Sequence, residues 1–187
     1  GRNSGEMVQS LVQATLVSLG VDVLDAGLTT TPSLEMGIIH HQAHGGIMIT
    51  ASHNPMEWNA LKFMNEKGEF IDNETGQKVL ELGDSQIKYN THLSIGSVTK
   101  IEDTIGRHID AILELPLLHV QAVKTKKYKV VVDAINSTGA LAIPPLLARL
   151  GAECIILNGE IKGVFNHNPE PLPENIIEIR QAVVDLK

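Results

Sequence analysis

The sequence predicts an α/β protein: a three-layer α/β/α domain with a mixed, largely parallel sheet, followed by the beginning of a second α/β/α domain. Helical and strand patterns alternate along the chain, which is typical of parallel strands covered by helices. Aromatic residues make up only 3% of the 187 residues, whereas 43% are hydrophobic. A core of Val, Ile, Leu and Ala suits strands that are buried on both faces.

The first half of the chain begins with four alternating elements. Ser4 suits the N-cap of the first helix, and Gly20 ends that helix. Pro32 fits the first turn of the second helix, which the pair Gly45-Gly46 breaks. The predicted elements are a helix from Met7 to Leu19, a strand from Val21 to Leu24, a helix from Pro32 to about His44 and a strand from Ile47 to Thr50.

A predicted hairpin comes next, before two more helical segments. Its first strand, Ala60 to Met64, leads into a tight turn at Asn65 to Gly68. Residues 73–83 have a polar helical pattern, whereas residues 84–100 lack a clear period and are expected to form a surface excursion. Helical spacing resumes from Asp103 to Leu118.

A second domain is expected to start after a basic linker. The predicted division is domain I over residues 1–120, the linker over 121–127 and domain II over 128–187. The predicted elements of domain II are a strand from Lys129 to Asp133, a helix from Ala140 to Leu150 and a strand from Glu153 to Leu157. Pro144 and Pro145 fit the first turn of that helix only if it starts late. We expect domain I to be truncated at its N-terminus and domain II to be incomplete.

Composition excludes several classes of function. The net charge of −7 argues against a nucleic-acid partner, which would need a surplus of Lys and Arg. There is no signal peptide and no apolar run of about 18 residues, so neither secretion nor a membrane partner is expected. Cys154, the only cysteine, lies in an apolar run and suits a small buried side chain. The lack of a disulfide framework favours a cytoplasmic location.

Residues 45–63 carry the strongest functional signal. A predicted strand ends in Thr50-Ala51-Ser52-His53-Asn54-Pro55, which places a hydroxyl where open α/β sheets bind their ligands. His53 adjoins this hydroxyl, and Lys62 lies on the following strand. A hydroxyl, an imidazole and a cation together suit phosphoryl or acyl transfer. The same residues also suit a simple polar turn, so residue types alone leave both interpretations open.

The residue string resembles the active-site loop of the α-D-phosphohexomutase superfamily, the phosphoglucomutase/phosphomannomutase enzymes. The similarity runs from Gly46 through Pro55 and continues at Asn59 and Lys62. Five further segments are similar to family motifs in the family's order: Arg2 to Met7, Ser18 to Val23, Gly27 to Pro32, Val132 to Gly139 and Asn168 to Leu172. The chain is identified as an N-terminal fragment covering most of domain I and the start of domain II.

The resemblance implies that Ser52 carries a phosphoryl group. The family interconverts hexose 1- and 6-phosphates through this phosphoserine and a bisphosphorylated sugar. Lys62 then matches an active-site lysine that polarises the transferring group or assists proton movement. His53 is expected to orient the loop or take part in proton transfer. Arg2 and Asn54 are expected to support the loop.

The resemblance also implies Mg²⁺, bound by the phosphate on Ser52 and by an Asp-x-Asp-x-Asp loop. No such triplet occurs in this sequence, so the remaining metal ligands are absent from the chain. The family's sugar and phosphate loops from its third and fourth domains are missing too. We therefore expect the chain alone to be inactive. Its expected substrate is a hexose phosphate, and its expected partners are the missing C-terminal domains of the same enzyme.

Three interpretations remain for the parent protein. The form Thr50-Ala51-Ser52 favours a phosphoglucomutase/phosphomannomutase, and a phosphoglucosamine mutase is the alternative within the family. The third interpretation belongs to another class, a non-catalytic α/β binding module that retains the loop. The full-length protein's activity on glucose, mannose and glucosamine phosphates separates the first two.

Four of the remaining histidines, His40, His44, His108 and His119, are expected to have no functional role, whereas His167, near Asn168 to Pro171, is left undecided. His40 and His44 share one face of the predicted helix, next to His41, and this spacing permits a metal site. No third ligand or carboxylate stands at a suitable spacing, so an exposed helix end is favoured. His108 and His119 are expected at the surface.

Overall fold

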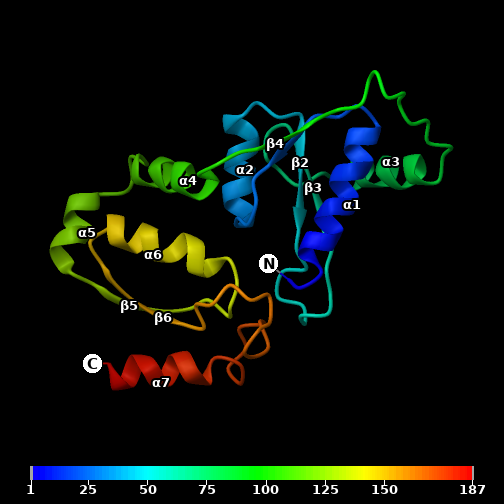
Figure 1. Ribbon diagram of the computed structural model, residues 1–187. Coiled ribbons are helices and arrows are strands. Elements are labelled where there is room, and N and C mark those ends of the chain that lie inside the picture. Colours follow the sequence, from blue (N-terminus) through cyan, green and yellow to red (C-terminus); the bar gives the residue numbers. More distant parts are fainter. Residues whose placement is uncertain (1, 187) are drawn as a thin grey trace.

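The N-terminal part of the protein consists of helices around two pairs of strands in the computed structural model, which describes residues 2–186 (Figure 1). Strand β1 pairs with β4 in parallel, and β2 pairs with β3 in antiparallel fashion. The elements are α1 (Gly5–Ser18), β1 (Val23–Asp25), α2 (Thr31–His40), β2 (Gly45–Ile49), β3 (Leu61–Asn65), α3 (Asn73–Gly83), β4 (Val98–Lys100) and α4 (Thr104–Leu113).

The C-terminal part has three layers. Strands β5 and β6 pair in parallel, with α6 on one face and α7 on the other (Figure 1). The elements are α5 (Val120–Lys126), β5 (Lys129–Asp133), α6 (Gly139–Arg149), β6 (Glu153–Leu157) and α7 (Ile177–Asp185). The α/β class, with parallel and antiparallel strands covered by helices, is confirmed.

N-capping hydrogen bonds from side chains explain the starts of two helices. The Thr30 hydroxyl accepts a hydrogen bond from the Ser33 amide at 3.3 Å at the start of α2. The Asp72 carboxylate accepts one from the Thr75 amide at 2.8 Å at the start of α3. Ser4 stands at the N-cap of α1 as predicted, but its side chain makes no capping bond.

Three expectations for the N-terminal part are wrong in detail. Helix α2 ends at His40, so His44 lies outside it and the two side chains share no helix face. The predicted excursion ends in β4, whose pairing is helped by the Asp22 carboxylate accepting from the Ser97 amide at 2.9 Å. His108 is half-buried rather than at the surface, because its Nδ1 lies 3.0 Å from the hydroxyl of the buried Ser33.

Two segments of the C-terminal part also differ from expectation. Helix α6 starts at Gly139, so Pro144 and Pro145 lie inside it rather than in its first turn. Each proline removes one backbone hydrogen bond, and packing of α6 on β6 stabilises the helix despite that loss. The residues predicted as a linker, 121–127, lie mostly in the helix α5.

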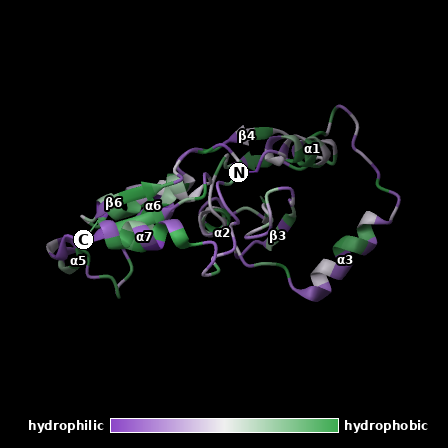
Figure 2. Cartoon of the chain, turned by 90° about the horizontal axis from the view of Figure 1, so that it is seen from below, coloured by the Kyte–Doolittle hydropathy of each residue, from purple (hydrophilic) through white to green (hydrophobic). Residues whose placement is uncertain are grey.

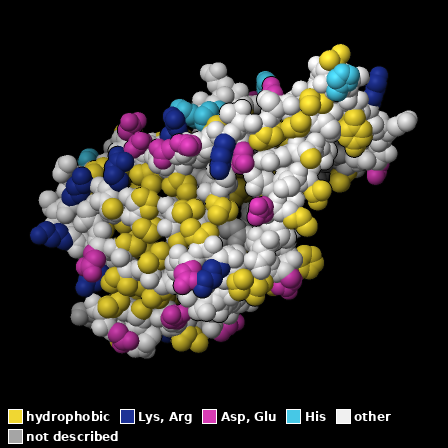
Figure 3. Space-filling view, in the orientation of Figure 1, with side chains coloured by type: hydrophobic (Ala, Val, Ile, Leu, Met, Phe, Trp, Pro, Cys, Tyr) yellow, Lys and Arg dark blue, Asp and Glu magenta, His cyan; other side chains and the backbone are white. Residues whose placement is uncertain are grey.

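The buried apolar residues of the described part of the chain are few. They are Ile38, Ala51, Met64, Ile109, Ala134 and Phe165. Helix α3 buries no residue and lies apart from the sheets (Figure 2). On the face seen in Figure 3, apolar side chains gather over the C-terminal part, with charged side chains around them. Within residues 2–186, no helix has both the length and the apolar character that a membrane crossing requires.

Candidate active site around Ser52

Residues 50–60, here called the serine loop, connect β2 to β3 and form a tightly closed turn. Its two ends are joined by the Thr50 amide, which donates to the Ala60 carbonyl at 2.9 Å. Inside it, Asn54 donates to the Ala51 carbonyl twice, from its amide at 3.0 Å and from its side chain at 2.8 Å. Ala51 is buried. The loop therefore presents a fixed backbone to its surroundings.

Ser52 is the strained point of this loop. Its φ of 54° lies in the left-handed region, which is costly for a residue with a Cβ. Its hydroxyl is exposed and lies 3.4 Å from Nδ1 of His53. Strain that the surrounding structure maintains at an exposed polar group is typical of functional sites.

A hollow of about 380 Å³ opens beside the Ser52 hydroxyl. Its volume falls within the range of about 300–1,000 Å³ typical of small-molecule sites. Its lining comes from the serine loop and β3: Ala51, Ser52, Asn54, Trp58, Asn59, Ala60 and Lys62. The structure thus brings Ser52, Asn54 and Lys62 to one hollow, whereas His53 lies beside Ser52 and outside this lining.

Lys62 supplies the positive charge of the hollow. It is half-buried on β3, opposite Met48 of β2, and its Nζ lies 5.6 Å from the centre of the Phe70 ring. This distance is within the range of a cation–π contact, and the stem of Lys62 is partly covered. A cation in this position can neutralise an anionic group held near Ser52.

Arg2 holds the serine loop from its carbonyl side. The guanidinium donates to three carbonyls, those of Ser52 at 2.8 Å, Asn54 at 3.0 Å and Pro55 at 2.7 Å. Arg2 is only 7% exposed. Burial lowers the pKa of Arg2, against the opposing charge of Glu57, and the guanidinium remains cationic at neutral pH. A buried cation with three charge-assisted bonds is a strong restraint on the loop.

The start of α1 provides a second brace. The Asn59 side chain donates to the Ser4 hydroxyl at 3.1 Å. Ser4 has a helical backbone, with φ −79° and ψ −4°, rather than the extended backbone typical of a capping residue. Arg2, just before α1, and Ser4, the N-cap residue of α1, thus both hold the serine loop. These contacts explain the polar residues Arg2 and Ser4 before the first helix.

Sequence reasoning missed two aromatic residues near this site. Trp58 lines the hollow and is 63% exposed. Phe165 lies in the loop between β6 and α7, with its ring centre 5.1 Å from the guanidinium carbon of Arg2. Both stand in polar, aperiodic segments. The only available signal was the rarity of aromatic residues in this chain.

A second polar cluster lies at the carboxyl ends of β5 and β6. Nε2 of His167 lies 2.7 Å from the Asp133 carboxylate, whose other oxygen accepts from the Asn158 side chain and the Ile135 amide, each at 3.0 Å. Burial acts to raise the pKa of Asp133, but these hydrogen bonds outweigh it and lower the pKa. Burial acts to lower the pKa of His167, but its bonds to Asp133 and the Asn168 carbonyl, with the charge of Asp133, raise it.

The His167–Asp133 pair is expected to make stability depend on pH. The raised pKa of His167 gives stability that is complete below about pH 6.5 and disappears as the pH rises past the folded-state pKa. The lowered pKa of Asp133 gives stability above about pH 4 that disappears on further acidification. Thermal unfolding should show the protein melting about 2 °C above a His167→Gln variant near pH 5.5, with a smaller difference at pH 8.5. A difference that grows toward pH 8.5 would contradict this assignment.

The described residues do not form a magnesium site. Within residues 2–186, no group of three or more His, Cys, Asp or Glu side chains is arranged to hold a metal ion. Mg²⁺ prefers carboxylate, phosphate and water oxygens in octahedral geometry. The serine loop carries a single carboxylate, that of Glu57, and this side chain belongs to no such group among the described residues. No step at this site is therefore assigned to a metal.

Two family models match the chain one after the other. The model of the phosphoglucomutase/phosphomannomutase α/β/α domain I matches residues 1–90, and that of domain II matches residues 106–187. The serine loop lies within the first match and the His167–Asp133 cluster within the second.

Related proteins of the same family match the chain over nearly its whole length. The chain is 38% identical to a phosphoglucomutase/phosphomannomutase from Thermococcus kodakarensis, over 94% of this chain and 38% of that protein. It is 33% identical to a phosphoglucosamine/phosphogalactosamine mutase from Sulfurisphaera tokodaii, over 100% of this chain and 41% of that protein. The chain thus spans about two fifths of the length of these relatives.

Solved structures share the fold. A crystal structure of a Thermus thermophilus protein superimposes with a TM-score of 0.82 at 24% identity, over 98% of this chain and 41% of that one. A phosphoglucomutase/phosphomannomutase family protein from Burkholderia thailandensis gives a TM-score of 0.73 at 25% identity, over 98% of this chain and 40% of that one. The chain belongs to the phosphoglucomutase/phosphomannomutase family and carries the α/β/α domains I and II of that family.

Proposed function

We propose that this chain is the phosphoserine-bearing part of a phosphohexomutase, an enzyme that interconverts hexose 1- and 6-phosphates. The observation that carries the proposal is the strained, exposed Ser52 hydroxyl beside a hollow that Lys62 also lines. Relatives named phosphoglucomutase/phosphomannomutase and phosphoglucosamine mutase support the same class of reaction. We place domain I at residues 1–120 and the start of domain II at residue 128.

In this proposal Ser52 is the phosphoryl carrier. The bond between Ser52 Oγ and phosphorus breaks as a hydroxyl oxygen of the hexose monophosphate forms a new bond to the same phosphorus. The sugar hydroxyl loses its proton and Ser52 Oγ gains one as its bond to phosphorus breaks, so a hexose bisphosphate and a free serine hydroxyl result. After the sugar turns around, its other phosphoryl group returns to Oγ, so the protein is regenerated and the phosphate has changed position on the sugar.

The surrounding residues act on position and charge. Phosphoryl transfer has a loose transition state with charge spread over oxygens, so in-line positioning and electrostatic stabilisation dominate its catalysis. Lys62 would neutralise charge on the transferring group. His53, whose Nδ1 lies 3.4 Å from Ser52 Oγ, would orient the serine loop or accept a proton. Arg2 and Asn54 would keep the serine loop in shape through the contacts described above.

We further propose that the full-length protein requires Mg²⁺. When bound, the ion would stabilise negative charge on the transferring phosphate. Its acidic ligands would come from outside this chain, as would the loops that select the sugar. The partners of this chain would therefore be further domains of the same enzyme.

Activity on three sugar phosphates tests the proposal. The full-length protein is assayed with the 1-phosphates of glucose, mannose and glucosamine. We expect conversion to the 6-phosphate, with kcat/KM at least about tenfold higher for the preferred class. Preference for glucosamine phosphate would favour the alternative suggested by the relatives named phosphoglucosamine mutase. No conversion of any of the three, and no phosphate on the protein, would favour the binding-module interpretation.

The 187-residue chain by itself is expected to show negligible mutase turnover. Its described residues supply only part of the proposed active site, with Ser52 and Lys62, and they form no metal site. The same activity assay on the isolated chain should give less than about 10⁻³ of the full-length rate, because the orientation of the substrate is lost. Turnover of the isolated chain near the full-length rate would contradict this expectation.

A further inference from the structure

We propose that Phe165 is a positioning residue of the active site: its ring fixes the Arg2 guanidinium and thereby couples the C-terminal part of the chain to the serine loop. The inference rests on the proposed function of Ser52. It assigns a role to a residue of the loop between β6 and α7, far in sequence from the site it serves.

Arg2 directs its side-chain donors toward the carbonyls of the serine loop. Its guanidinium gives NH1 to Pro55 and NH2 to both Ser52 and Asn54, so the edge of the group faces the serine loop. A planar guanidinium that donates along its edges leaves its face free for stacking. Since every described contact of Arg2 with the loop is to a carbonyl, the loop's shape depends on where this plane lies.

An aromatic ring lies next to this guanidinium. The guanidinium carbon lies 5.1 Å from the centre of the Phe165 ring, inside the range of about 6 Å for a cation–π contact. Phe165 is 9% exposed and Arg2 is 7% exposed, so solvent screens this contact little. An aliphatic side chain would fill the same space but would not offer the negative face that attracts a cation.

The segment that carries Phe165 is attached on both sides of this residue. Before Phe165, the Asn136 side chain accepts from the Glu160 amide at 3.2 Å and donates to the Val164 carbonyl at 3.3 Å. After it, His167 is held by Asp133 at the end of β5. Phe165 is thus fixed on both sides to the carboxyl end of β5.

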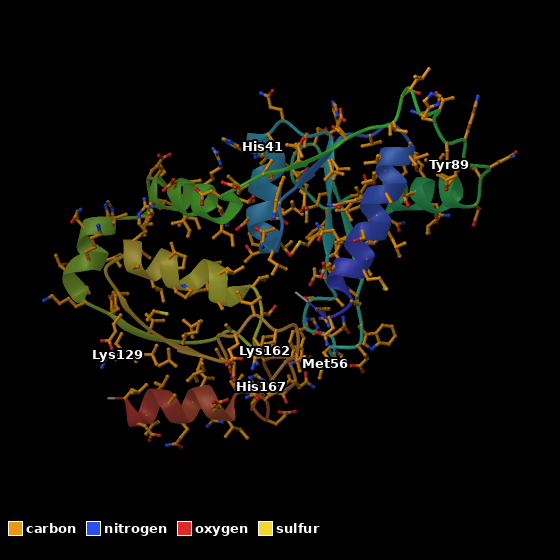
Figure 4. All side chains as sticks on the ribbon, viewed as in Figure 1. His41, Met56, Tyr89, Lys129, Lys162 and His167 are labelled. Atoms are coloured by element: carbon orange, nitrogen blue, oxygen red, sulfur yellow. The ribbon has the colours of Figure 1, made fainter. Side chains whose placement is uncertain are left out.

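The two parts of the chain meet at this contact. Figure 4 shows Lys162 and His167 on the segment after β6, close to the loop that carries Met56. The contact between Arg2 and Phe165 confirms that these segments are neighbours in space. A change in the position of the C-terminal part therefore acts on the serine loop through one buried cation and one buried ring.

This arrangement predicts a specific kinetic effect. Arg2 bonds the backbone carbonyls of the serine loop, so a loosened Arg2 should misplace Ser52 more than it weakens substrate binding. Misplacement of a reacting group by about 1 Å can cost about a hundredfold in rate. A defect at Phe165 should therefore lower kcat and leave KM nearly unchanged.

The test compares three variants of the full-length protein. Phe165→Leu keeps an apolar side chain and removes the ring, Phe165→Tyr keeps the ring, and Val164→Ala changes the exposed neighbour as a matched control. We expect Phe165→Leu to lower kcat about tenfold, with KM changed less than about twofold. Phe165→Tyr should keep at least about half of the kcat, and Val164→Ala should match the unmodified protein.

A double variant distinguishes positioning from general packing. If Phe165 acts through Arg2, Phe165→Leu should cost less than about twofold in kcat when Arg2 is already replaced by Leu. Hydrogen exchange gives a readout that does not depend on activity: the amides of Asn54 and Trp58 should exchange at least about fivefold faster in Phe165→Leu, with the amides of β5 unchanged.

The outcomes separate this inference from the proposed function. Absence of mutase activity in the unmodified protein defeats the proposed function, whereas the hydrogen-exchange comparison still tests the coupling. Normal kcat and normal loop exchange in Phe165→Leu would overturn the coupling. Equal losses in Phe165→Leu and Phe165→Tyr, or additive losses with Arg2→Leu, would also overturn it.

Discussion

Replacing Ser52 with alanine in the full-length protein is expected to reduce mutase turnover by at least about 10⁴-fold, because the variant has no oxygen to carry the phosphoryl group. Alanine keeps the Cβ, so the backbone at a φ of 54° remains about as strained as in the natural loop. The fold and the Arg2 contacts should therefore persist. The measurement is kcat on the preferred hexose 1-phosphate, with thermal unfolding to show that the variant is folded.

The matched control is Ser85→Ala, which removes an exposed hydroxyl bonded only to the Leu82 carbonyl among its described contacts. This variant should keep full activity. A folded Ser52→Ala variant with more than about a tenth of the natural kcat would show that Ser52 is not the carrier. In that case the strain at Ser52 would need another explanation.

Replacing Arg2 with leucine is expected to lower kcat about a hundredfold. The change leaves the carbonyls of Ser52, Asn54 and Pro55 without their donor, and it also removes the ring contact with Phe165. Loss of charge-assisted bonds of this kind should lower the free energy of unfolding by about 1–3 kcal/mol. Steady-state kinetics and denaturant unfolding measure the two effects separately.

Two further variants define the role of Arg2. Arg2→Lys keeps the charge, but an ammonium cannot span three carbonyls as a guanidinium does, so its kcat should lie between those of the natural protein and Arg2→Leu. Arg107→Leu is the control, since Arg107 is an exposed arginine of α4 that bonds Nε2 of His40 at 3.0 Å. An Arg2→Leu variant within about threefold of natural kcat would contradict a positioning role.

The fold was predictable wherever local sequence decides it. Strands β5 and β6 have the bounds that their apolar runs predicted, because both are covered by helices on either side. The starts of α2 and α3 follow from Thr30 and Asp72, whose side chains satisfy free amides. Strand β4 was not predictable, because its three exposed residues carry no period and pair only where β1 is already in place.

The candidate site divides in the same way. The serine loop and Lys62 were predictable, because they lie close together in the sequence and a single hairpin brings them to one place. The contacts of Arg2 with loop carbonyls 50 and more residues away are a product of tertiary packing, and only the resemblance to a family motif predicted that Arg2 supports the loop. Phe165 was not predictable, because its contact needs both parts of the chain to be folded and placed.

Direct mapping of the phosphate tests the central claim, that Ser52 carries the transferred group. The full-length protein is incubated with hexose 1,6-bisphosphate that carries radioactive phosphorus. It is then digested, and the labelled peptides are identified by mass spectrometry. The experiment is repeated after a chase with unlabelled hexose monophosphate. We predict one labelled site, at Ser52, which loses its label to the sugar during the chase at a rate no slower than kcat. Label on another residue, or label on Ser52 that the chase does not remove while turnover proceeds, would contradict the account.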